Sequence, residues 1–190
     1  MYKAITDHFI IETVSNYDSA MALINDKMDE ARKIMQDTDQ LIQNAAMPGK
    51  IEEGMSSYGS GDIKDLYQTY ERYQKIQRNT IRDMTGYMRE LMERQDSMNR
   101  IYACYMVLCH RERRVLELLY KNEYMKVAAG ILEAEEEFCA SRSSVIRFKQ
   151  KALGHIKELY ASNLTHRQIF LLKPDMYGNF NLMNPECAYR

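Results

Sequence analysis

The stretch from Asp62 to Leu108 constrains the fold more than any other part of the chain. It contains no proline and only one glycine, Gly86, and it is rich in residues that favour helix. From Ile81 to Tyr105 apolar residues recur in steps of three and four, with Gln95 as the one polar exception. We therefore predict one helix up to about Leu108. At 1.5 Å per residue it would be about 70 Å long, so it must pack on another helix, on a second chain, or on both.

A similar apolar stripe precedes it, between Tyr17 and Ala45. Its members alternate in steps of three and four, which is typical of a coiled-coil seam: Met21, Ile24, Met28, Ala31, Met35, Thr38, Ile42 and Ala45. Asn16 or Asp18 suits the N-cap of this helix, and residues 2–14 are expected to form a separate short helix. Glycines and Pro48 predict a loop at about residues 46–61, and Asp62 suits the cap of the long helix. Residues 1–109 therefore predict a long antiparallel helical hairpin that also mediates oligomerisation.

Residues 110–162 predict three shorter helices. Val115, Leu118 and Leu119 mark the first helix, and Val127, Ile131 and Leu132 mark the second. A polar break at residues 141–144 precedes the third, whose apolar residues share one face: Val145, Phe148, Ala152, Ile156 and Leu159. This order of a helix, a turn and a capped helix is typical of a helix-turn-helix.

The third helix is basic, because no acidic residue occurs between Ser141 and Lys157. Its polar face carries the side chains that read DNA: arginine contacts guanine, glutamine contacts adenine, and serine contacts bases or phosphate. We predict that the duplex-binding residues are Ser141 as N-cap, Arg142, Ser143, Ser144, Arg147, Gln150 and Lys151. Arg142, Lys149 and Lys157 lie nearer the edge, where contact with phosphate or snorkelling is expected. The alternative is a solvated basic face on a core helix.

These residues also resemble a known family. Glu112, Arg113, Val115, Leu116, Leu119 and Tyr120, followed by Ser141, Ser143, Ser144, Val145, Arg147, Ala152 and Leu153, resemble region four of bacterial sigma factors. The resemblance is closest to phage-encoded, sigma-like regulators of late genes, of the ArpU and RinA type, and it covers about 50 residues. It implies that the serine-led helix is a recognition helix for promoter DNA, with RNA polymerase as a further partner.

Residues 163–190 differ in character, since they contain Pro174, Gly178 and Pro185. Two alternatives stay open for this tail. Residues 169–172 and 179–183 pair as a small hairpin, or the tail is extended and docks on the helices. The predicted fold class is therefore all-α: a helical hairpin, a C-terminal helix-turn-helix, and a short irregular tail.

Composition narrows the function classes. The net charge of −1 requires any DNA-binding surface to be a local patch. The four histidines and four cysteines show no metal-ligand spacing, and we expect no enzyme activity, cofactor, metal or membrane span. The leading prediction is a cytoplasmic, sequence-specific, DNA-binding transcription regulator of phage or prophage type that forms homo-oligomers through its long helices. The alternatives are a helical adaptor that does not bind DNA, favoured by the acidic cluster Glu133–Glu137, and the DNA-recognition subunit of a packaging machine.

Overall fold

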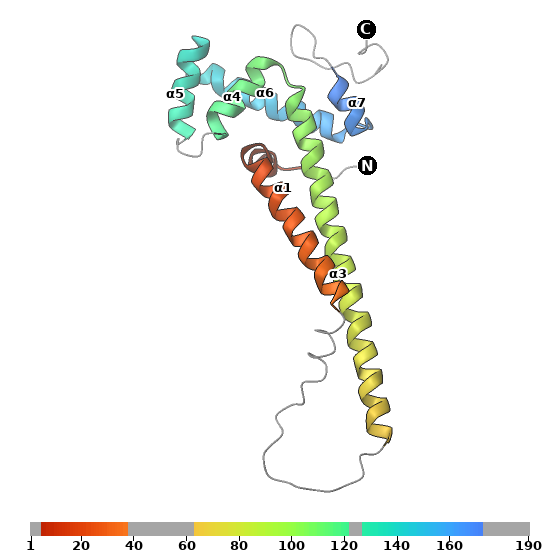
Figure 1. Cartoon of the computed structure of the whole chain (residues 1–190). Helices are drawn as coiled ribbons and strands as arrows, with labels where there is room; N and C mark the ends of the chain where they lie inside the picture. Colours follow the sequence, from red (N-terminus) through yellow and green to blue (C-terminus); the bar gives the residue numbers. More distant parts are fainter. Residues whose placement is uncertain (1–4, 38–62, 122–126, 173–190) are drawn as a thin grey trace. The chain divides into compact units, whose positions relative to one another are not determined.

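The computed structural model describes residues 5–37, 63–121 and 127–172 (Figure 1). These residues confirm the all-α fold class, and no strand occurs among them. The helices are α1 (Asp7–Gln36), α3 (Ile63–Met106), α4 (His110–Tyr120), α5 (Val127–Phe138), α6 (Arg142–Ala161) and α7 (His166–Leu171). The loop predicted at residues 46–61, its neighbour Asp62 and the stripe members Thr38, Ile42 and Ala45 lie outside the described residues.

The chain divides into two compact units, and both α1 and α3 contribute to each of them. Residues 1–22 and 94–190 form the first unit, and residues 23–93 form the second. The boundary predicted between residues 109 and 110 falls inside the first unit. The reason is that the end of α3 shares a hydrophobic core with α4 and α6.

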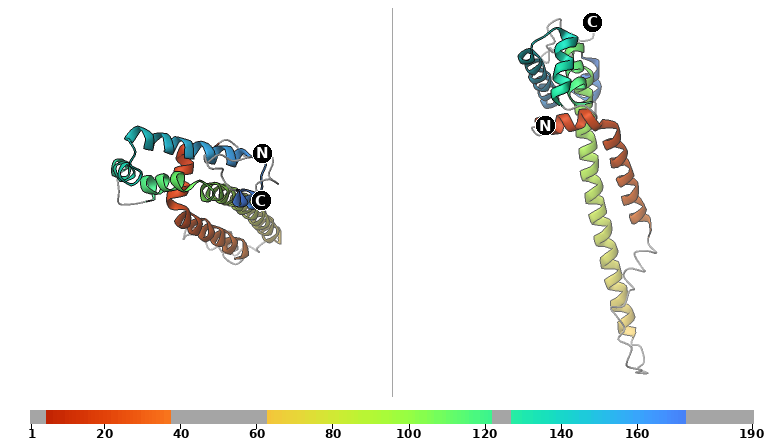
Figure 2. Two further views of the ribbon diagram at one scale, coloured as in Figure 1. Left: turned by 90° about the horizontal axis from the view of Figure 1, so that it is seen from above. Right: turned by 90° about the vertical axis from the view of Figure 1, so that its left-hand side faces the viewer.

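In the second unit, residues 23–36 of α1 run in the opposite direction beside the later part of the 63–93 segment of α3, and the first turns of α3 extend past the end of α1 (Figures 1 and 2). Ile24, Met28 and Ala31 of the predicted stripe are buried, as is Leu91 on α3. Ile81 was predicted to face inward with them, but it is 40% exposed. The heptad pattern therefore identifies the buried face of α1 well and that of α3 only toward its later turns.

The long helix α3 spans 44 residues without a break at Gly86. Its end enters the core of the first unit, where Met98, Ile101 and Tyr105 are almost fully buried. The prediction of one continuous helix to about Leu108 is confirmed, with the last helical residue at Met106.

The helix α1 bends at Asn16, whose backbone angles are φ −123° and ψ 26°. Two separate helices were predicted to meet here, and the structure joins them across this kink. Beyond the kink the Tyr17 ring stacks on Tyr102, with 3.9 Å between ring centroids, and its hydroxyl donates a 2.7 Å hydrogen bond to Asn99. Tyr17 thereby anchors the part of α1 just after the bend to the end of α3.

A buried arginine links α3 to the end of α6. The Arg100 side chain is 1% exposed, and its guanidinium donates to four backbone carbonyls: Tyr160 at 2.8 Å, Leu164 at 2.7 Å, Ser162 at 2.6 Å and Leu159 at 3.4 Å. Terminal carbonyls of a helix have no partner within the helix and carry partial negative charge. Arg100 therefore caps α6 from a residue about sixty positions earlier in the chain.

The start of the tail is helical, so the hairpin prediction is wrong for its first arm, residues 169–172. The Thr165 hydroxyl accepts from the Gln168 backbone N–H, and the Gln168 side chain accepts from the Thr165 N–H, which forms a capping box for α7. Ile169 and Leu172 are buried in the core of the first unit, while Phe170 and Leu171 are exposed. The second arm, residues 179–183, lies outside the described residues.

Candidate nucleic-acid interface

Helices α4, α5 and α6 pack around a small core of their own within the first unit. Its buried members are Val115, Leu118, Leu119, Ala134 and Val145. Leu132 and Val127 were predicted to mark the apolar side of α5, but they are 61% and 44% exposed. Helix α5 instead turns Gly130 and Ala134 toward α4. A Cβ atom at Gly130 would lie 2.4 Å from the backbone oxygen of Leu118, so the absence of a side chain permits this close approach.

The connection between α5 and α6 is a tight turn at residues 139–141. The Cys139 N–H donates to the Glu136 carbonyl at 3.3 Å, and the Ala140 N–H donates to the Glu135 carbonyl at 3.0 Å. These two bonds form a Schellman motif, in which the residue after the helix adopts the left-handed conformation. Cys139 has φ 46°, a position that glycine usually occupies. The turn thus fixes the direction in which α6 leaves α5.

Ser141 is the N-cap residue of α6, as predicted, with φ −73° and ψ 156°. Its carbonyl accepts from the N–H groups of Ser144 and Val145 at 2.8 and 3.0 Å. Its hydroxyl does not bond to a backbone N–H of the first turn, but lies 3.0 Å from the hydroxyls of both Ser143 and Ser144. The start of α6 therefore presents a cluster of three hydroxyl groups.

The polar face of α6 is exposed. Arg142, Ser143, Arg147 and Gln150 are exposed, and Ser144 is half-buried. Within the described residues, no ion pair or hydrogen bond engages the side chains of Arg142, Arg147 or Gln150. On the opposite face Val145, Ala152, Ile156 and Leu159 are 0% exposed. The helix thus buries its apolar side and presents two unpaired arginines beside a glutamine.

Lys151 lies at the edge of this face and has a partner. Its ammonium is 3.7 Å from Oε1 of Glu112, and the other carboxylate oxygen of Glu112 lies 3.1 Å from Nδ1 of His155. The Glu112 side chain is only 3% exposed. Sequence reasoning missed this buried carboxylate. The sequence did hold one signal for it. Lys151 and His155 are four residues apart, so they are neighbours on one side of α6, where a single carboxylate can contact both.

Two further cations on this module cover aromatic rings. The Lys149 ammonium lies 5.4 Å from the centroid of the Tyr120 ring, and the Arg111 guanidinium lies 5.3 Å from that of Phe148. Lys149 is half-buried, and its ammonium faces Tyr120 of α4.

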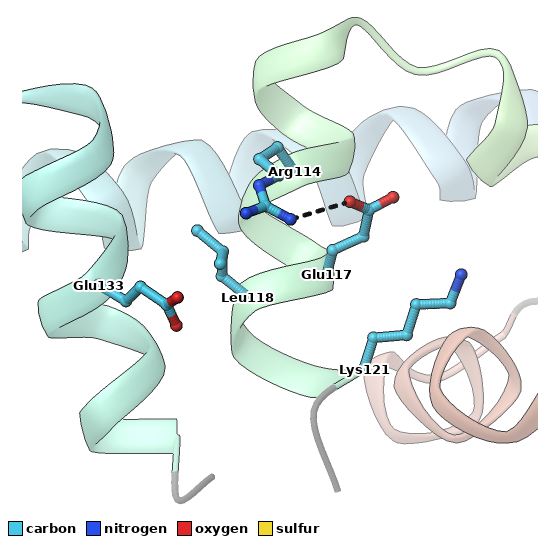
Figure 3. A pocket seen from close by; sticks show the side chains of 5 residues that line it. All are labelled: Arg114, Glu117, Leu118, Lys121 and Glu133. Atoms are coloured by element: carbon cyan, nitrogen blue, oxygen red, sulfur yellow. Dashed lines mark ion pairs between the residues drawn. The ribbon is translucent and has the colours of Figure 1, made fainter.

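Part of the acidic cluster on α5 is held by α4. Arg114 donates to both carboxylate oxygens of Glu137 at 2.9 to 3.1 Å, and these hydrogen bonds lower the pKa of Glu137. Glu133 faces α4 across an open hollow of about 470 Å³ (Figure 3). Arg114, Glu117, Leu118 and Lys121 line the rest of it, and Arg114 also lies 3.6 Å from Glu117. One cation of α4, Arg114, therefore offsets one acid of α5, Glu137.

Among residues 5–37, 63–121 and 127–172, no three His, Cys, Asp or Glu side chains come together in a way that holds a metal ion. No helix in the described parts of the chain is long and apolar enough to cross a membrane.

Comparison of the chain with protein-family models, with curated proteins and with solved structures finds no match in any of the three. The resemblance to sigma region four therefore stays a prediction. The arguments about function below depend on the geometry of α4, α5 and α6.

Proposed function

We propose that the chain is a sequence-specific, double-stranded-DNA-binding protein that uses α6 as its recognition helix. The observation that carries this proposal is the exposed face of α6. Arg142, Arg147 and Gln150 project from it without partners among the described residues, directly after the turn that ends α5. A helix-turn-helix places the first turns of its second helix against base edges in the major groove.

Each side chain on the face has a role in this proposal. Arg147 and Gln150 lie one turn or more inside α6, where bidentate contacts to guanine and adenine are made. Arg142 lies in the first turn, where phosphates bind and where the N–H groups of the helix also favour an anion. The exposed Ile146, which lies between Arg142 and Arg147 in the sequence, suits contact with a thymine methyl group.

The biological role that fits such a module is regulation of transcription, of the phage or prophage type that the sequence resemblance implies. RNA polymerase as a partner and a cytoplasmic location belong to the same proposal. Self-association through the long helices is also proposed. Its support is the exposed apolar surface on α3 in the second unit, where Tyr67, Tyr70, Ile81 and Met92 are 40% to 64% exposed.

One observation favours a second candidate, a helical adaptor that binds protein. The α5 surface next to the turn combines Leu132 at 61% exposure with the exposed Glu136. Acidic residues near a phosphate backbone oppose DNA binding. An adaptor would use this α5 surface, whereas a DNA-binding protein would use the polar face of α6.

The two candidates are separated by two variants of α6. Arg147→Ala should cost about 1–3 kcal/mol of specific binding and relax the sequence preference. Arg142→Ala should weaken binding to all sequences alike and reduce the salt slope by about one unit. Arg142 stands at the positive end of the helix dipole, so its removal should not destabilise the fold. Fluorescence titration of labelled duplexes over a range of salt measures both effects. If neither variant differs from the parent protein, α6 is not the DNA-binding surface.

A further inference from the structure

The contact between Glu112 and Lys151 joins the core of the module to the face that would meet DNA. Glu112 lies in the first turn of α4 and is 3% exposed, whereas the Lys151 side chain is 42% exposed on α6. One carboxylate oxygen is 3.7 Å from the Lys151 ammonium. Lys151 follows Arg147 by four residues on α6, so the two side chains start one helical turn apart, and Lys151 lies at the edge of the polar face, where phosphates are contacted.

A carboxylate and a phosphate compete for an ammonium, because both are anionic oxygen acceptors. An ammonium that already contacts a carboxylate must give up that contact to bind a phosphate. It therefore gains less binding free energy from the phosphate than a fully hydrated ammonium does. Arg142 and Arg147 have no such partner among the described residues. Lys151 thus differs from the other cations on the polar face of α6.

The second carboxylate oxygen of Glu112 has a partner of its own. Lys151 can therefore move away from Glu112 without leaving this buried carboxylate unpaired. His155 Nδ1 lies 3.1 Å from that oxygen, and His155 is itself 8% exposed. A buried carboxylate that lost all its partners would be strongly unfavourable. With His155 in place, Glu112 keeps one hydrogen bond when Lys151 turns toward a phosphate.

We propose that Glu112 is an internal competitor for the DNA backbone, holding Lys151 and so limiting the affinity of α6 for duplex DNA. This inference rests on the proposed DNA-binding function. Glu112 is a positioning residue here, because it acts through Lys151 and does not itself touch DNA. It makes the protein bind DNA less tightly, and with a shallower salt dependence, than its basic helix alone would allow.

The experiment is a duplex titration over a range of salt with Glu112→Gln, Lys151→Gln and the double variant in the full chain. Glu112→Gln should bind more tightly than the parent protein, and its salt slope should steepen by about one unit because one more phosphate contact forms. In the Lys151→Gln background the same change should leave the slope where it was. Glu90→Gln removes the same charge from the α3 segment of the second unit and should have no effect.

The outcomes separate this inference from the function on which it rests. If the parent protein binds duplex and Arg147→Ala weakens it, but Glu112→Gln keeps the parent slope, the competitor role is wrong and DNA binding stands. A steeper slope that persists in the Lys151→Gln background also overturns it. If no variant binds duplex, both proposals fail.

If circular dichroism finds Glu112→Gln unfolded, Glu112→Asp carries the test. Aspartate keeps the negative charge, but its side chain is one methylene shorter, so its carboxylate holds Lys151 less well. Glu112→Asp should therefore raise the affinity for duplex DNA, by less than Glu112→Gln would. If the affinity is unchanged, Glu112 is not a competitor for Lys151.

Discussion

Gly130 allows α5 to pack closely on α4, and replacing it with alanine tests the geometry of the module. A Cβ atom there would lie 2.4 Å from the Leu118 oxygen, 3.1 Å from the Leu118 carbonyl carbon and 3.2 Å from the Leu119 Cα. All three are backbone atoms, which cannot turn away as a side chain can. Ordinary contact begins at 3.4 Å, so α5 must move away from α4 by about 1 Å.

The magnitude follows from two opposing effects. Overpacking of this kind costs about 1–3 kcal/mol, and the shift also loosens the contacts of the fully buried Ala134. Alanine has a better helix propensity than glycine by about 1 kcal/mol. Gly130→Ala should therefore lower the free energy of unfolding by up to about 2 kcal/mol, which corresponds to a fall in Tm of up to about 8 °C for a chain of this size.

Gly154→Ala is the matched control. Gly154 is also inside a helix of the first unit, but no atom lies within 4 Å of a Cβ built there. This variant should gain about 1 kcal/mol from helix propensity alone. Thermal or urea unfolding followed by circular dichroism at 222 nm measures both variants, and their difference isolates the clash. Equal stability of the two variants would refute the close approach of α4 and α5.

Three further predictions concern single residues of the first unit. Arg100→Met should lower the free energy of unfolding by about 3–5 kcal/mol, because four carbonyls near the end of α6 lose a charged donor. Urea unfolding measures this loss, and a loss below about 1 kcal/mol would mean that the Arg100 cap contributes little. Cys139→Gly should raise the stability by about 0.5–1 kcal/mol, since the left-handed backbone at this turn suits glycine, and a lower Tm would contradict the assigned turn. In native protein at pH 8 a thiol reagent should modify the exposed Cys139 but not Cys104, because burial raises the pKa of the Cys104 thiol to about 12; mass spectrometry of the labelled peptides checks this.

Much of the module follows from periodicity. The apolar residues of α6 recur at helical spacing, so the sequence alone predicts both its buried face and the exposed position of Arg147. Ser141 was identified as the N-cap because polar caps have a strong local preference. The break near Asn16 and the length of α3 also follow from local residue choice.

The errors arise where a distant partner decides the outcome. Arg100 and Glu112 look like ordinary solvated charges in sequence, yet both are buried. Backbone carbonyls at and just after the end of α6 accept from Arg100, and Lys151 and His155 of α6 lie beside the Glu112 carboxylate. Hydrophobicity also misplaced Leu132, since the fit of Gly130 against α4 sets the rotation of α5. Neither of the two alternatives for the tail, a hairpin or an extended segment, included a helix at residues 166–171, because the capping signal of Thr165 and Gln168 was not used.

Titration of the 190-residue chain with duplex DNA tests the central claim most directly. Duplexes of about 30 base pairs from the sequence flanking its own gene, and a scrambled duplex of equal composition, would be titrated between roughly 50 and 200 mM salt. The account predicts binding at low salt, an affinity that falls linearly with salt on logarithmic axes, and a preference for one native fragment. Folded protein that binds none of these duplexes at the lowest salt would contradict the assignment of α6 as a recognition helix.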